Sequence, residues 1–128
     1  MIEQHRNEIV VFCNTENTLD REVLMYAKNH FTNVREVDLS SYMPTPTRLM
    51  EIVGHLKIDL LDLINHHSPV YPQYEKQLKS MGEVDILSVI QHNPSLLHTP
   101  IVISHDGGDI IRSLSQMMEF VERNVAVG

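Results

Sequence analysis

The order of hydrophobic periodicities between residues 9 and 39 constrains the fold of this chain most strongly. Ile9 to Phe12 is a short apolar run, mostly β-branched, which predicts a buried strand. From Thr18 to Phe31 the apolar residues recur at helical spacing and predict a helix. Asn33 to Leu39 alternates between apolar and polar residues and predicts a second strand. A strand, a helix and a strand in this order form a βαβ unit with parallel strands and a right-handed crossover.

A run of short helices follows in the middle of the chain. Ser40 to Thr47 is a loop with two prolines, and Thr47 is the predicted N-cap of the next helix. Apolar residues then recur at helical spacing up to about residue 93. The pattern breaks near Lys57, at His66 to Pro69 and at Gly82. We therefore predict a helical insert at about 47–93.

The last third of the chain returns to strands. Thr99 to Ser104 predicts a third strand, His105 to Asp109 a turn, and Ile110 to Arg112 a short fourth strand. A final helix is predicted from Ser113 to about Asn124. The order βαβ, helical insert, ββα predicts an α/β protein with a thioredoxin-like fold and a mixed four-stranded sheet, in one domain over residues 1–128. Such folds usually carry a proline before the third strand, so Thr99–Pro100 is the candidate for a cis peptide bond.

Composition excludes several classes of partner. The net charge is −7, and the ten Lys and Arg residues are scattered, which argues against direct binding of nucleic acid. No apolar run reaches the length of a membrane span, and the first residues have no signal-peptide core. The single cysteine, Cys13, excludes an internal disulfide and predicts a reducing, cytoplasmic setting. The eight histidines show no metal-ligand spacing, so no metal site is expected. No cofactor is expected either.

Three segments, in order and with matching spacing, resemble the glutaredoxin-linked arsenate reductases and the related Spx-type transcription regulators. They are "NTENTLDREVL" from Asn14, "TPTRLMEIV…IDLLDLI" from Thr45 and "IQHNPSLLHTPIVI" from Ile90. The first lies on the family's active-site loop, which usually reads Asn-Pro-x-Cys-Ser-x-Ser-Arg-x-x-Leu. The resemblance covers roughly Ile9 to Val121 and implies the thioredoxin-like fold predicted above.

The catalytic residues of the family do not carry over to this chain. Asn17 stands where the family has its catalytic cysteine, and Thr99 replaces the arginine before the proline. Arg112 alone matches one of the family's oxyanion-holding arginines. A thiolate at a helix N-terminus has a depressed pKa, and an amide cannot replace it in forming a bond to arsenic. Asn is instead a good N-cap, and Asp20 adds favourable negative charge in the first turn.

These observations predict a redox-inactive member of the family that acts as a protein-interaction or regulatory module. Its site is expected where the altered loop, the helical insert and the turn before the third strand meet. The residues of that site are Asn14, Asn17, Thr18 and Arg21 in the degenerate loop, with Thr99, Pro100 and Arg112 as possible oxyanion or partner contacts. Because Spx-type relatives bind RNA polymerase, the resemblance makes that enzyme a conceivable partner.

Two alternatives stay open. In the first, the protein is an arsenate reductase or another glutathione-linked thiol oxidoreductase that uses Cys13 with Arg112, and glutathione or glutaredoxin is its partner. Cys13 ends the first strand, four residues before the usual nucleophile, where a thiol tends to pack inertly under the loop. In the second, the helix N-terminus and Arg112 bind a small oxyanion without turnover, although Glu16 and Asp20 oppose an anion there.

Overall fold

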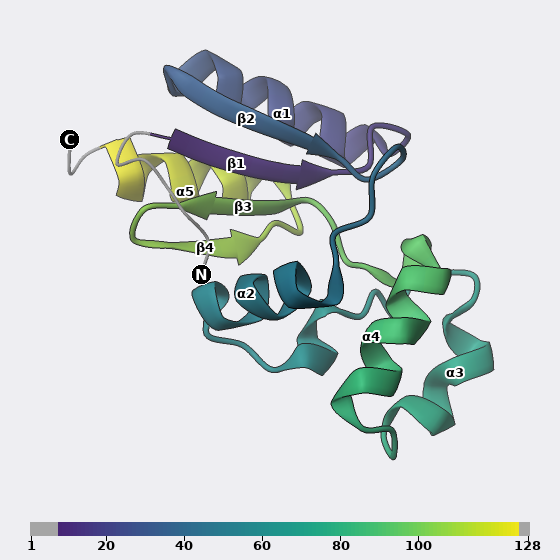
Figure 1. Ribbon diagram of the computed structural model, residues 1–128. Coiled ribbons are helices and arrows are strands. Elements are labelled where there is room, and N and C mark those ends of the chain that lie inside the picture. Colours follow the sequence, from purple (N-terminus) through teal and green to yellow (C-terminus); the bar gives the residue numbers. More distant parts are fainter. Residues whose placement is uncertain (1–7, 126–128) are drawn as a thin grey trace. The chain divides into compact units, whose positions relative to one another are not determined.

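Four strands form one mixed sheet in the order β2-β1-β3-β4 (Figure 1). The structure is a computed structural model that describes residues 8–125. The strands are β1 (Glu8–Cys13), β2 (Asn33–Asp38), β3 (Ile101–Ser104) and β4 (Gly107–Ile110). β1 pairs in parallel with β2 and antiparallel with β3, and β3 pairs antiparallel with β4. The predicted α/β fold with a mixed four-stranded sheet is confirmed.

The chain divides into two compact units. The described part of the first is Met43–His98, which contains the helical insert predicted at 47–93. The described part of the second is residues 8–42 and 99–125, which contain the sheet, α1 (Thr18–His30) and α5 (Leu114–Val125). We describe each unit by itself.

The core of the sheet unit forms where α1 and α5 pack on one face of β1. Ile9, Val11 and Cys13 alternate along β1 and share this core with residues from both helices, such as Val23 and Met117. The intervening residues of β1 are buried as well, which explains why this strand is a continuous apolar run. β2, by contrast, lies at the edge of the sheet and has exposed charged residues.

Three α-helices and two short 3₁₀-helices form the helical unit. They are α2 (Pro46–Leu56), η1 (Leu60–Leu63), α3 (Tyr71–Leu78), α4 (Glu83–His92) and η2 (Pro94–Leu96). The predicted breaks at Lys57 and Gly82 are confirmed: Lys57 ends α2 in the left-handed conformation with φ of 58°, and Gly82 is the N-cap of α4. Residues 58–64, which lie between two of the predicted breaks in the run of short helices, contain only the 3₁₀ turn η1.

The N-cap of α2 is Thr45, and the prediction of Thr47 is wrong. The Thr45 hydroxyl accepts a hydrogen bond from the Arg48 backbone N–H at 3.2 Å. Pro46 fixes this start: its own φ suits the first helical position, and it restricts Thr45 to extended backbone, with ψ of 162°. Thr47 is therefore already inside the first turn.

Thr45→Ala is expected to lower the free energy of unfolding by about 1 kcal/mol, because it leaves a helix-terminal N–H without its side-chain acceptor. Thr47→Ala is the matched control, since Thr47 is an exposed threonine two residues away. Urea unfolding of the two variants measures the difference. Equal losses in both would contradict the assignment of the cap.

The fourth strand begins earlier than the sequence predicts. Gly107–Ile110 forms β4, whereas residues 110–112 were the predicted strand and 105–109 the predicted turn. Because Ser104 pairs directly with Gly107, the hairpin needs only His105 and Asp106 as its turn. The ladder ends at the pair of Ile101 and Ile110, so Arg112 lies after β4 and not in it.

Candidate functional site

The loop between β1 and α1 is closed by its own backbone and side chains. The Asn17 N–H donates to the Asn14 carbonyl at 2.9 Å, and the Glu16 N–H donates to the Asn14 side-chain oxygen at 3.0 Å. Asn17 is the N-cap of α1 with extended backbone, as the sequence predicts, but its side chain makes no capping hydrogen bond. The hydrogen bond from the Glu16 N–H to the Asn14 side chain forms an Asx-turn, which stabilises the loop without any ligand.

Arg21 is tied to the same loop. Its Nη1 donates to the Thr15 carbonyl at 2.7 Å, and its Nη2 lies 3.3 Å from the Thr18 hydroxyl. The Thr15 hydroxyl in turn donates to Asp38 at the end of β2, at 3.3 Å. The guanidinium of Arg21 therefore braces the start of α1 from the exposed side.

Asp20 is the acidic residue predicted for the first turn of α1, and the structure adds that it is buried, with only 2% of it exposed. Its Oδ2 accepts a hydrogen bond from the Asn14 backbone N–H at 2.8 Å. The signal was present in the sequence: Asp20 shares the buried stripe of α1 with Val23, Leu24 and Ala27, at intervals of three, four and seven residues.

The surroundings of Asp20 act on its carboxyl group in two directions. Burial raises its pKa above the ordinary value, because a charge is poorly solvated there. Hydrogen bonds from the Asn14 backbone and from the side chains of Thr99 and Asn17 favour the charged form and limit this rise. The structure thus brings Asn14, Asn17 and Thr99 together around one buried carboxyl group.

Cys13 is completely buried at the end of β1. Its carbonyl accepts a hydrogen bond from the Leu39 N–H at 2.8 Å. Burial, with repulsion from the carboxylates of Glu36, Asp20 and Asp38, raises the pKa of its thiol from 9.0 to about 12. A thiol in this position is almost entirely protonated at neutral pH, which suits a small core residue and not a nucleophile.

Three predicted contact residues flank the last two strands: Thr99 and Pro100 lie before β3, and Arg112 lies after β4. The Thr99–Pro100 peptide bond is cis, as predicted. Pro100 is buried, and its carbonyl accepts a hydrogen bond from the Ile111 N–H at 2.9 Å. Arg112 is exposed, and among residues 8–125 no hydrogen bond or ion pair joins its guanidinium to the loop. The role of Arg112 as an oxyanion or partner contact therefore stays a prediction.

Within the part of the chain that the structure describes, no three His, Cys, Asp or Glu side chains are grouped so that they would hold a metal ion. In the same residues, no helix has both the length and the apolar character needed to cross a membrane.

Comparison with known proteins gives a likeness in fold. No protein-family model matches the chain, and no curated protein matches it. Among solved structures, the arsenate reductase from Vibrio cholerae is 16% identical, with a TM-score of 0.78 over 90% of this chain and 98% of that one. A Yersinia pestis protein assigned as an arsenate reductase is 20% identical, with a TM-score of 0.77 over 87% of this chain and 98% of its own.

A further solved structure is described as related to the arsenate reductases. The arsenate reductase-related protein from Brucella melitensis is 10% identical, with a TM-score of 0.66 over 88% of this chain and 93% of that one. At these identities the likeness shows the fold alone, and the chemistry of this chain has to be judged from the residues of its own loop. The chain has the thioredoxin-like fold of the arsenate reductase structures, with a helical insert between its second and third strands.

Proposed function

We propose that this protein has no thiol redox activity and acts by binding another protein, in a cytoplasmic setting. The lack of thiol redox activity is inferred from Cys13, the only thiol in the chain. Cys13 is completely buried, and its pKa is raised to about 12. The position that begins α1 holds the exposed amide of Asn17 instead. A nucleophile needs both access to its substrate and a deprotonated sulfur.

The oxyanion-binding alternative is weaker for a separate reason. The carboxyl group of Asp20 already accepts the Asn14 N–H that points into the loop, at 2.8 Å. An oxyanion bound there would have to displace a buried side chain and lie beside Glu16 in the same loop. We therefore expect no binding of arsenate or phosphate, and no gain in melting temperature in millimolar concentrations of either.

Without a reactive thiol, the protein would act through its surface, and binding of another protein is the role that we infer. RNA polymerase is a conceivable partner by analogy with the Spx-type regulators that the sequence resembles. The net charge of −7 favours a partner surface rich in Lys and Arg.

Arsenate reduction in the presence of glutathione, glutaredoxin and NADPH tests the proposal. We expect no oxidation of NADPH above background with the unmodified protein or with Cys13→Ser, while a glutaredoxin-linked arsenate reductase serves as positive control. Turnover by the unmodified protein that disappears in Cys13→Ser would overturn the proposal and make Cys13 the nucleophile. Activity gained by Asn17→Cys would show that the loop needs only its thiol restored.

A further inference from the structure

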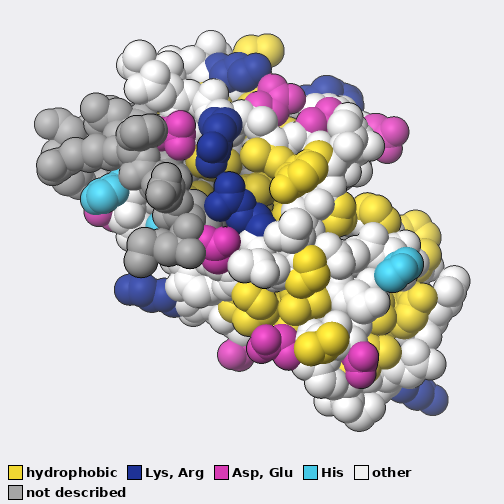
Figure 2. All heavy atoms as spheres, viewed as in Figure 1, with side chains coloured by type: hydrophobic (Ala, Val, Ile, Leu, Met, Phe, Trp, Pro, Cys, Tyr) yellow, Lys and Arg dark blue, Asp and Glu magenta, His cyan; other side chains and the backbone are white. Residues whose placement is uncertain are grey.

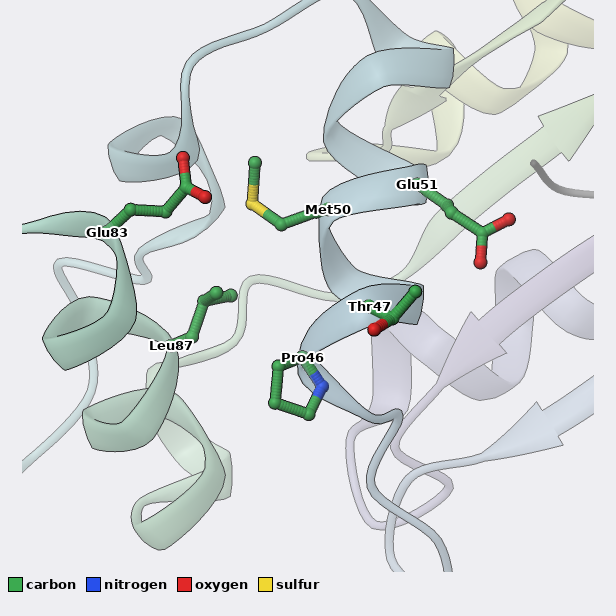
Figure 3. Close-up of a pocket in the computed structure, with 6 residues that line it drawn as sticks. All are labelled: Pro46, Thr47, Met50, Glu51, Glu83 and Leu87. Atoms are coloured by element: carbon green, nitrogen blue, oxygen red, sulfur yellow. The ribbon is translucent and has the colours of Figure 1, made fainter.

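The helical unit carries an open groove between α2 and α4. Six residues line it: Pro46, Thr47, Met50 and Glu51 from α2, and Glu83 and Leu87 from α4. Met50 extends from α2 toward α4, where Glu83 and Leu87 lie opposite it (Figure 3). The groove has a volume of about 470 Å³, within the size range of sites that hold a ligand or a few side chains.

The groove combines an apolar floor with acidic side chains. Pro46, Met50 and Leu87 supply carbon and sulfur atoms, while its two charged residues, Glu51 and Glu83, are both carboxylates. Neither Lys nor Arg lines it. Figure 2 shows hydrophobic side chains gathered on the visible face of the helical unit, with acidic side chains beside them.

Val84 is an exposed apolar residue next in sequence to Glu83, one of the groove residues. It follows Glu83 in the first turn of α4, precedes Asp85, and is 78% exposed. The two acidic residues have a structural benefit of their own, because negative charge stabilises a helix N-terminus. Covering the exposed Val84 side chain would remove apolar area from water, which would favour binding of an apolar partner segment there.

We propose that this groove binds a segment of another protein in which an apolar side chain is flanked by lysine or arginine. The apolar side chain would lie against Met50 and Leu87, and a flanking basic side chain would pair with Glu83. This inference rests on the proposed function, since it names the kind of partner that the protein would bind. An acidic or phosphorylated segment would meet only like charge in the groove.

The proposal is tested with short fluorescein-labelled peptides and fluorescence anisotropy. One peptide has leucine flanked by lysines, a second has glutamate in place of each lysine, and a third has serine in place of the leucine. We expect measurable binding of the first peptide alone, with amide chemical-shift changes at Met50 and Leu87 in NMR spectra of the unmodified protein. Binding should weaken at high salt because the partners carry opposite charge.

Two variants and a matched control locate the contact. Glu83→Lys is expected to weaken binding about tenfold, and Val84→Ser several-fold, through lost charge pairing and lost apolar contact respectively. Glu75→Lys changes the net charge equally, but at an exposed position on α3. It should weaken binding much less. Val84→Ser keeps the test decisive if Glu83→Lys disturbs the start of α4.

Three results would overturn the inference: no binding of the leucine–lysine peptide, equal binding of the glutamate peptide, or equal losses in Glu83→Lys and Glu75→Lys. These outcomes leave the proposed lack of redox activity untouched, because the arsenate assay measures it separately. Conversely, turnover through Cys13 would remove the proposed function even if the peptide bound.

Discussion

Cys13 in the folded protein is expected to react with iodoacetamide at neutral pH about a thousand times more slowly than in the unfolded chain. The pKa of its thiol is raised from 9.0 to about 12, so the reactive thiolate is about a thousand times rarer at any pH well below both values. Its complete burial slows the reaction further. Mass spectrometry of alkylation time courses, with and without guanidinium chloride, measures the ratio.

A thiol moved by four residues provides the control for this experiment. In the double variant Cys13→Ser, Asn17→Cys, the only thiol lies at an exposed position at the N-terminus of α1. We expect this thiol to react at a rate close to that of the unfolded chain. Fast alkylation of Cys13 in the folded, unmodified protein would show that the loop opens readily and would restore the reductase alternative.

Removing the buried carboxyl group of Asp20 is expected to give the second large effect. Asp20→Ala should lower the free energy of unfolding by about 1–3 kcal/mol, because the Asn14 N–H and the Thr99 hydroxyl lose their acceptor in a buried place. Asp20→Asn keeps the shape and one acceptor oxygen, so it should cost less. Urea unfolding at neutral pH measures both variants.

The dependence on pH distinguishes a desolvated carboxyl group from a well-paired one. The pKa of Asp20 is raised in the folded state above its ordinary value of 3.8. The stability that unmodified Asp20 provides relative to Asp20→Asn is therefore fully present below pH 3.8 and is lost as the pH rises through the folded-state pKa. If the unmodified protein instead gained stability over Asp20→Asn as the pH rose, the hydrogen bonds to the carboxylate would outweigh the cost of burying its charge.

Asp38 is the matched control, because its pKa shifts in the other direction. Hydrogen bonds from the Ser40 side chain, at 2.7 Å, and from the Ser40 backbone, at 3.0 Å, lower the pKa of Asp38. The stability that unmodified Asp38 provides relative to Asp38→Asn is thus expected to be present above pH 3.8 and to be lost as the pH falls through the lowered pKa. The two aspartates should give opposite slopes.

The sheet was predictable from the sequence because its strands and helices have distinct periods. The continuous apolar run of β1 reflects burial on both faces, and the spacing in α1 reflects one buried stripe. The cis bond at Thr99–Pro100 was predictable from its place before β3. What failed were boundaries set by single hydrogen bonds, such as the cap at Thr45 and the early start of β4.

The candidate site was harder to predict than the fold, because its chemistry depends on which way a few side chains point. Asn17 and Asp20 each looked suited to the start of a helix, yet Asn17 makes no capping bond and Asp20 turns inward. Their roles follow from contacts with Asn14 and with Thr99, which is distant along the chain. No local pattern encodes such a contact, although the buried stripe of α1 does include Asp20.

The exposed edge of the sheet has a consequence for how molecules of this protein meet one another. β2 is an edge strand, and its two central residues, Arg35 and Glu36, are exposed and oppositely charged. A symmetric antiparallel pairing of two such edges, centred on either residue, would set Arg35 against Arg35 or Glu36 against Glu36. Like charges directly opposite each other are unfavourable. The strand therefore discourages continuation of the sheet into a second molecule, which is a safeguard against aggregation.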